Sequence, residues 1–140
     1  MARPLYYLDS NVFIYNFEDV QIFSAQLTRL FQEIREADAE ICTSLLTLSE
    51  LLVKPLRSGD QNLVARYRLL FRSPHAVRVL DLDEKTMLQA AELRSRTALR
   101  LPDALHLASA QCAAADYFVT GDRRMRDIDS INVRLLQELC

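Results

Sequence analysis

The chain has 140 residues with a formal net charge of −2, and half of its residues are hydrophobic. This length predicts one domain spanning residues 1–140, and the apolar content supports a packed core and excludes disorder as the default state. Only Gly59 and Gly121 are glycine. The glycine-rich loops that cradle nucleotide phosphates therefore cannot be built from this sequence.

Targeting signals, cysteines and basic residues narrow the class of protein. No apolar run approaches the roughly 18 residues of a membrane helix, and no signal-peptide pattern opens the chain, so we expect a soluble cytoplasmic protein without a membrane partner. The three cysteines are widely spaced and odd in number, which favours reduced thiols over a disulfide framework or a zinc site. All but two of the 17 basic residues are arginine, whose planar fork suits phosphate groups. A nucleic-acid partner is compatible with this composition.

Short apolar runs alternate with helical periodicity along the chain. The runs predict strands at 5–8, 40–43, 76–80 and 117–120, with a weaker fifth signal at 132–135. Apolar spacing and capping residues predict a helix from 11 onward and further helices at 22–37, 45–56, 61–71, 84–98 and 102–115. Strands separated by helices predict an α/β fold, a three-layer α/β/α sandwich with a mainly parallel central sheet.

Four acidic residues from distant segments are predicted to meet at one edge of this sheet. Asp9 follows the first strand and Asp122 follows the fourth, while Glu50 and Asp103 lie on otherwise apolar helical stretches. Ligands of open parallel sheets bind beyond the carboxyl ends of the strands. Each acid alone is typical of a cap, a turn or an ion pair, but the four together predict a site.

Such a cluster requires a counter-charge. Two unit charges about 5 Å apart repel by roughly 3 kcal/mol at an effective dielectric constant of 20. Four carboxylates must therefore be partly protonated or share a cation. Oxygen ligands favour hard divalent ions, so the sequence predicts Mg²⁺ (or Mn²⁺) rather than zinc.

Four segments resemble the motifs of a known family in their order and approximate spacing. They are Leu8-Asp9-Ser10-Asn11-Val12, Ser49-Glu50-Leu51-Leu52, Pro102-Asp103-Ala104-Leu105-His106-Leu107-Ala108 and Val119-Thr120-Gly121-Asp122. The chain resembles PIN-domain nucleases over essentially its whole length. It is most similar to the VapC-type ribonuclease toxins of bacterial toxin-antitoxin pairs.

The resemblance implies a metal-dependent endoribonuclease and assigns roles to particular residues. The implied catalytic residues are Asp9, Glu50, Asp103 and Asp122. Asp9, Asp103 and Asp122 would hold the metal, and Glu50 would complete its shell or orient the attacking water. Hydrogen bonds from a supporting shell would come from Ser10, Asn11 and Thr120. The resemblance also implies a homodimer and an antitoxin protein that binds near the active site.

Other polar residues near these motifs are weaker candidates. Arg123, Arg124 and Arg126 directly follow the fourth acid and are candidates for contact with RNA. His106 shares a helix face with Asp103, but we expect a packed, hydrogen-bonded histidine rather than a ligand or general base. Asp127 and Asp129 could add a fifth acid, although a solvated turn is the simpler interpretation.

Two other functional classes compete with the nuclease. The first is a non-catalytic PIN-fold module that binds RNA or serves assembly, against which the complete set of four acids argues. The second is a haloacid-type phosphatase, which also places an aspartate after its first strand. That chemistry needs a second aspartate two positions later, where Asn11 stands, and a catalytic lysine that is not obvious here.

Overall fold

The central sheet of the computed structural model, which describes residues 2–18, 21–126, 128 and 131–139, is parallel throughout. Within these residues its strands are β1 (Leu5–Leu8), β2 (Glu40–Ser44), β3 (Arg78–Leu80), β4 (Tyr117–Thr120) and β5 (Val133–Leu135). They are ordered β3-β2-β1-β4-β5, and each neighbouring pair runs parallel. The predicted α/β fold is confirmed, including its fifth strand.

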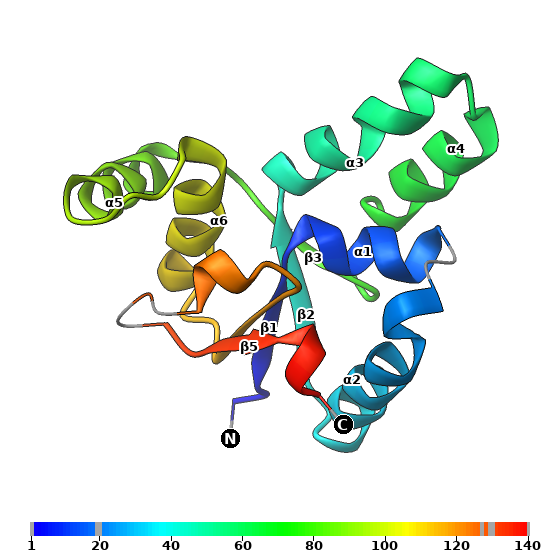
Figure 1. Ribbon diagram of the computed structural model, residues 1–140, viewed down its shortest axis with the longest axis horizontal. Helices are drawn as coiled ribbons and strands as arrows, with labels where there is room; N and C mark the ends of the chain where they lie inside the picture. Colours follow the sequence, from blue (N-terminus) through cyan, green and yellow to red (C-terminus); the bar gives the residue numbers. More distant parts are fainter. Residues whose placement is uncertain (1, 19–20, 127, 129–130, 140) are drawn as a thin grey trace.

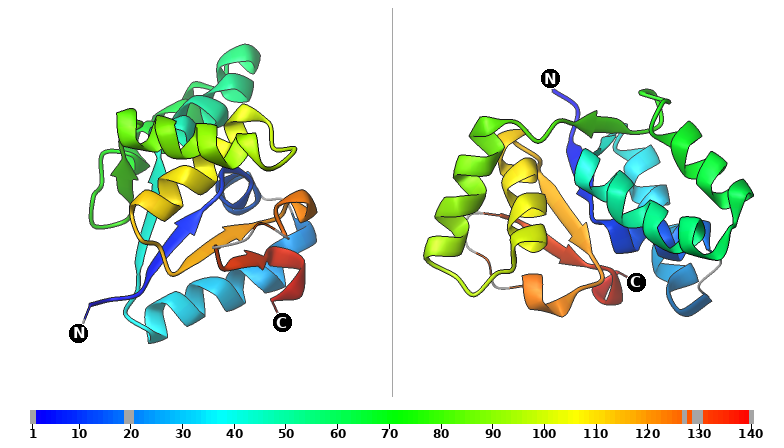
Figure 2. Two further views of the ribbon diagram at one scale, coloured as in Figure 1. Left: turned by 90° about the vertical axis from the view of Figure 1, so that its left-hand side faces the viewer. Right: turned by 90° about the horizontal axis from the view of Figure 1, so that it is seen from above.

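Helices cover both faces of this sheet, as Figures 1 and 2 show. They are α1 (Ser10–Phe17), α2 (Ser24–Glu36), α3 (Leu45–Ser58), α4 (Gln61–Leu70), α5 (Glu84–Ser95) and α6 (Leu101–Cys112). Short 3-10 turns lie at Gln21–Phe23, Arg123–Met125 and Leu136–Glu138. One layer contains α5 and α6, the other contains α1 and α2, and the paired helices α3 and α4 extend outward beside α1 (Figure 1).

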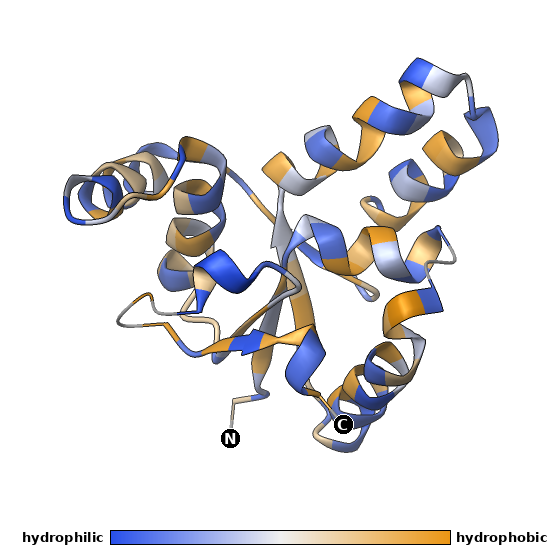
Figure 3. Cartoon of the chain, viewed as in Figure 1, coloured by the Kyte–Doolittle hydropathy of each residue, from blue (hydrophilic) through white to orange (hydrophobic). Residues whose placement is uncertain are grey.

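Alternate residues of β1 pack into two separate hydrophobic cores. Tyr7 packs in the cluster that contains Leu107 of α6, whereas Leu8 packs in the cluster that contains Val12 of α1. Every residue of β1 is buried, as expected of a central parallel strand with helices on both sides. The helices alternate between polar and apolar stretches in Figure 3, which matches one face turned to the sheet and one to solvent.

Two helices end earlier than their composition predicts. α5 ends at Ser95, and the Thr97 hydroxyl donates a hydrogen bond to the carbonyl of Leu93 in its last turn. α6 ends at Cys112 because Ala114 adopts a left-handed backbone with φ of 56°. Alanine favours helix in isolation, so this stop reflects the need to turn the chain into β4.

The carboxyl ends of the strands lie together at one edge of the sheet. α1 and α3 begin directly after β1 and β2, and the first turn of α6 lies near α3 at the same edge (Figure 1). Within the described residues, no helix is both long enough and apolar enough to cross a membrane.

Candidate metal and active site

Asp9 is the most buried of the four predicted acids, with only 6% of its surface exposed. It caps α1, where Oδ1 accepts a hydrogen bond from the Ser10 backbone N–H at 2.7 Å. Its Oδ2 accepts another from the Thr120 hydroxyl, also at 2.7 Å. Burial raises the pKa of Asp9, while the charge of His106 and the Thr120 hydrogen bond lower it without cancelling the effect of burial. Ionised Asp9 is therefore costly unless a cation lies nearby.

Hydrogen bonds also join the ends of β1 and β4 around this carboxylate. The Asn11 side chain donates to the Thr120 hydroxyl at 3.2 Å and accepts from the Gly121 backbone N–H at 3.0 Å. A Cβ atom on Gly121 would lie 3.0 Å from the Tyr15 ring, so a larger residue there would push against that ring. The sequence proposed Ser10, Asn11 and Thr120 as supporting residues. Each makes the hydrogen bonds described here, and their part in holding a metal stays a prediction.

Glu50 and His106 form the centre of the site. His106 Nε2 lies 2.6 Å from Glu50 Oε1 and 3.5 Å from Asp9 Oδ1. His106 is 2% exposed, whereas the side chain of Glu50 is 35% exposed. On its other side, His106 Nδ1 lies 2.8 Å from the hydroxyl of the buried Tyr7. The ring is therefore held by hydrogen bonds at both nitrogens.

The charges in this pair favour an imidazolium donating to a carboxylate. Burial lowers the pKa of His106, but its hydrogen bond to Glu50 and the charges of Asp9 and Glu50 outweigh burial and raise it. Burial likewise raises the pKa of Glu50, but the hydrogen bond and charge of His106 outweigh it and lower that pKa. In the absence of a metal, His106 is thus the counter-charge for two carboxylates.

Asp103 and Asp122 lie at the rim and pair with arginines. Arg100 Nε lies 3.4 Å from Asp103 Oδ2, and Arg124 Nη2 lies 2.6 Å from Asp122 Oδ2. Both carboxylates remain accessible, with side chains 16% and 20% exposed. The hydrogen bond from Arg124 lowers the pKa of Asp122. Both rim acids are therefore neutralised by exposed arginine side chains.

The rim acids and the buried group belong to one electrostatic environment. The Asp103 charge raises the pKa of His106, and the Arg100 charge lowers the pKa of both Glu50 and Asp122. Asp103 lies one turn before His106 on α6, and Asp9 and Asp122 follow the neighbouring strands β1 and β4. The four predicted acids therefore lie at the carboxyl edge of the sheet. The tightest group within the described residues contains Asp9, Glu50 and His106, whose ligand atoms all lie within 4.8 Å of one another.

The donor set of this group suits a divalent cation. It offers two carboxylates and one imidazole around a common point. Asp9 is too buried for water to solvate its charge. Carboxylate ligands suit Mg²⁺ and Mn²⁺, and imidazole suits transition-metal ions. The residues present therefore fit a metal, and the identity of the ion is a separate question.

The three arginines after Asp122 differ in their surroundings. Arg124 pairs with Asp122, Arg126 pairs with Glu138, and Arg123 is exposed in the same short turn. Asp127 and Asp129, the other two acids considered in this segment, lie outside the described residues.

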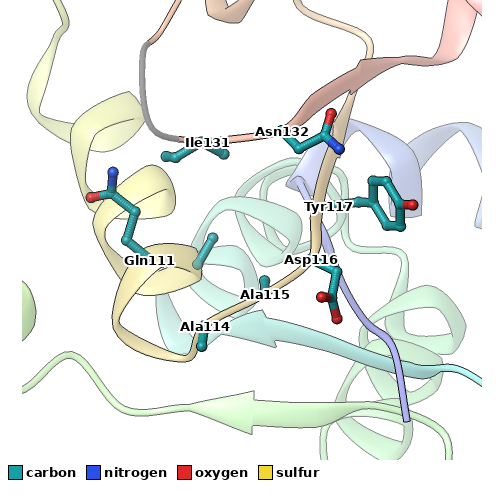
Figure 4. Close-up of a pocket in the computed structure, with 8 residues that line it drawn as sticks. Gln111, Ala114, Ala115, Asp116, Tyr117, Ile131 and Asn132 are labelled. Carbon is teal, nitrogen blue, oxygen red and sulfur yellow. The ribbon is translucent and has the colours of Figure 1, made fainter. Parts of the chain in front are cut away.

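A hollow of about 570 Å³ has its lining residues drawn in Figure 4. Because β1 and β4 are parallel and the hollow precedes β4, it lies at the opposite end of the sheet from Asp9, which follows β1. It lies where α6 ends and β4 begins, and Asp116 is the acid that lines it. Asp116 Oδ2 accepts a hydrogen bond from the Leu5 backbone N–H at 2.7 Å and thereby serves the sheet. This hollow is separate from the candidate active site.

Sequence reasoning undervalued His106 and did not single out Tyr7 or Arg100. The i, i+3 spacing of Asp103 and His106 was the available signal, since it puts both on one face of α6. Arg100 stands three residues before Asp103, at the N-cap of the same helix. The hydroxyl of Tyr7 gave no signal, because only the packing of β1 against α6 directs it at the histidine.

Comparison with known proteins identifies the family of this chain. The family model described as the PIN domain matches residues 6–131. The chain therefore belongs to the PIN-domain family. No curated protein is similar enough in sequence to give a significant match.

The similar solved structures include members of VapBC toxin-antitoxin systems and FitAB complexes. VapBC-1 from nontypeable Haemophilus influenzae gives a TM-score of 0.76 at 16% identity, covering 96% of this chain and 99% of that chain. VapBC2 from Rickettsia felis, bound to a DNA fragment from its promoter, gives 0.74 at 17% identity, with coverages of 94% and 98%. VapBC-5 from Mycobacterium tuberculosis gives 0.62 at 23% identity, with coverages of 94% and 96%. At these identities the likeness establishes the fold alone.

Proposed function

We propose that this chain is a metal-dependent endoribonuclease that hydrolyses RNA phosphodiester bonds and acts as the toxin of a toxin-antitoxin pair. The observation that carries the proposal is the buried Asp9 carboxylate, grouped with Glu50 and His106 at the carboxyl edge of a PIN-domain sheet. A buried carboxylate that is costly in the free protein is a favourable place for a cation.

The proposed metal residues are Asp9, Asp103 and Asp122, with Mg²⁺ or Mn²⁺ as the ion. When bound, a divalent cation lowers the pKa of a water and stabilises the charge that develops on the phosphate. Thr120 and the Ser10 backbone fix the orientation of Asp9 through both of its oxygens. The partly exposed Glu50 completes the shell of the ion, directly or through water, and orients the attacking water.

Arg123, Arg124 and Arg126 are proposed to contact the RNA backbone. An arginine guanidinium can donate two hydrogen bonds to one phosphate group, and all three residues follow Asp122 directly in the chain. Arg124 would exchange Asp122 for a phosphate when that carboxylate binds the ion. This exchange would couple metal binding to RNA binding.

The proposed partners are a cognate antitoxin protein and a second copy of this chain in a homodimer. Support comes from the similar toxins, which were crystallised in toxin-antitoxin complexes. Apolar side chains of α3 and α4 that are more than 60% exposed, Leu56 and Leu69, offer surface for a protein contact. The proposed place of action is the cytoplasm, where the RNA substrate is found.

Cleavage of structured cellular RNAs tests this proposal directly. The purified chain should cleave RNA in Mg²⁺ or Mn²⁺ and lose activity on chelation. Asp9→Asn and Asp103→Asn should each lower the cleavage rate at least about 100-fold, because each removes a charge that holds the ion. Asp81→Asn, at an exposed strand end, is the matched control and should keep full activity. Cleavage that persists in chelator, or in the Asp9→Asn, Asp103→Asn double variant, would contradict the proposal.

A non-catalytic RNA-binding or assembly module is the second candidate. One observation favours it, because Arg100 and Arg124 already neutralise Asp103 and Asp122. A module of this kind would bind RNA with or without a divalent ion and leave it intact. The same assay, run with a gel-shift measurement of RNA binding, separates the two functions.

A further inference from the structure

We propose that His106 Nε2 is a direct ligand of the metal ion, beside Asp9 and Glu50, and that this nitrogen makes the site prefer Mn²⁺ over Mg²⁺. The inference deepens the proposed function by assigning a ligand and an ion preference to the same site. It concerns ion binding alone, so it is testable whether or not the chain cleaves RNA.

The distances from His106 Nε2 to the two carboxylates fit a shared ion. Two ligand atoms each about 2.1 Å from an ion, at angles between 90° and tetrahedral, lie roughly 3 to 3.5 Å apart. His106 Nε2 and Asp9 Oδ1 are already 3.5 Å apart. Glu50 Oε1, at 2.6 Å from Nε2, must retreat by less than an ångström. Its side chain is 35% exposed, so it has room for that movement.

The ring of His106 is oriented for this role by Tyr7. The Tyr7 hydroxyl donates to Ser44 Oγ at 2.9 Å, so its oxygen is free to accept the proton of His106 Nδ1 at 2.8 Å. Nε2 then faces the two carboxylates. Metal-binding histidines usually have such a partner on the second nitrogen, which fixes the tautomer and the ring plane. The ion takes the place of the proton between Nε2 and Glu50, and that proton leaves to solvent.

A nitrogen ligand changes which ion the site prefers. Mg²⁺ selects oxygen ligands and retains much of its water, whereas imidazole suits transition-metal ions. The four acids alone would form an all-oxygen site suited to Mg²⁺. Because His106 is 2% exposed and points at the buried Asp9, an ion bound to Asp9 meets the imidazole directly.

Pulsed electron paramagnetic resonance of the Mn²⁺-loaded chain tests the ligand. A histidine nitrogen bound to Mn²⁺ gives a ¹⁴N modulation of the electron spin echo, which changes to the ¹⁵N pattern when histidine is ¹⁵N-labelled. We expect this signal in the wild type and its loss in His106→Asn. His75→Asn is the matched control, since His75 is the other histidine of the chain and is exposed in a turn. The labelling experiment needs no variant, so it holds even if His106→Asn fails to fold.

Calorimetric titration with Mn²⁺ and Mg²⁺ tests the preference. The wild type should bind Mn²⁺ more tightly than Mg²⁺, and His106→Asn should lower this ratio about tenfold or more, through loss of Mn²⁺ affinity. Tyr7→Phe should weaken Mn²⁺ binding less and keep the ¹⁴N signal. Bound Mn²⁺ without a histidine nitrogen signal would overturn the inference and leave the nuclease proposal standing. Failure of the wild type to bind Mn²⁺ would also overturn the inference. The RNA cleavage assay would then decide the nuclease proposal separately.

Discussion

Asp9 is a carboxylate with 6% of its surface exposed, and its pKa is raised chiefly by burial. A raised pKa means that the ionised group costs stability above that pKa, and the cost is relieved as the pH falls toward the ordinary value of 3.8. In the metal-free chain the ionised carboxylate carries this cost. A cation removes it, so the same burial that weakens the free protein favours metal binding.

The Asp9→Asn variant should therefore be more stable than the wild type in chelator at pH 7. An asparagine still caps α1 and accepts one of the two hydrogen bonds, while the buried charge is gone. We expect the free energy of unfolding to rise, measured by urea denaturation. Added Mn²⁺ should stabilise the wild type and leave the variant nearly unchanged. Asp81→Asn, in an exposed position, should change stability by less than about 0.5 kcal/mol in either buffer.

His106 shows where residue-level reasoning from sequence stops. The pattern predicted a packed, hydrogen-bonded histidine, and its burial and its contacts to Tyr7 and Glu50 confirm that description. The sequence did not reveal that both partners belong to a group of polar side chains at the active edge. That information lies in the rotation of α6 against β1, which no local pattern encodes.

At the level of elements, Glu33 joins three segments that are distant along the chain. Arg134 of β5 donates to Glu33 through both terminal nitrogens, Nη1 and Nη2, and the Tyr6 hydroxyl of β1 donates to Glu33 Oε2 at 2.6 Å. The Arg134 hydrogen bond, more than any other cause, lowers the pKa of Glu33. This cluster fixes α2 and the short edge strand β5 to the centre of the sheet.

Replacing Glu33 by glutamine should lower the free energy of unfolding at pH 7 by about 1 kcal/mol, because the partly exposed ion pair is lost. A lowered folded pKa gives stability that is present above the ordinary value of 4.5 and lost as the pH falls through the folded pKa. The difference in free energy of unfolding between wild type and Glu33→Gln should therefore shrink below about pH 4.5. Urea denaturation at several values between pH 3 and 7 would show this. Glu36→Gln, on an exposed turn of the same helix, is the control. The same difference in free energy of unfolding at pH 3 as at pH 7 would contradict this account.

Element boundaries were predictable where a capping residue stands in the sequence. Asp60 and Asp83 cap α4 and α5 with their side chains, as the sequence indicates. The predicted end of α6 was wrong by three residues. Ala113, Ala114 and Ala115 favour helix, but the backbone of Ala114 is in the left-handed region. There the chain must enter β4, and tertiary packing outweighs a propensity of about 1 kcal/mol or less per residue.

At the level of the whole molecule, the reactivity of the Cys42 thiol in β2 measures unfolding of the domain. It has no exposed surface at the centre of the sheet, and burial raises the pKa of its thiol to about 12. A thiol reagent can reach it only when the sheet separates from α5 and α6. Its modification rate therefore follows the unfolded fraction of the entire domain.

In a chain carrying Cys112→Ser and Cys140→Ser, Cys42 should react with a chromogenic disulfide reagent at pH 8 only at the rate set by unfolding. Saturation with Mn²⁺ at 100 times its dissociation constant should slow this reaction about 100-fold, because the ion binds the folded state alone. When this chain also carries Asp9→Asn, Mn²⁺ should no longer slow the labelling of Cys42. Rapid labelling of the folded protein, insensitive to urea, would show that β2 opens locally instead.

The sequence alone determined the α/β class, the parallel sheet and the edge at which the acids gather. These follow from the alternation of apolar runs with helical periodicity and from the geometry of parallel strands, both of which are local or nearly local properties. Only the tertiary structure decided which side chains meet there: the buried Asp9, Glu50 and His106 group, and the arginines that pair with Asp103 and Asp122. The physical reason is that burial, charge pairing and ring orientation depend on how helices pack across the sheet, and residues far apart in the chain set these together.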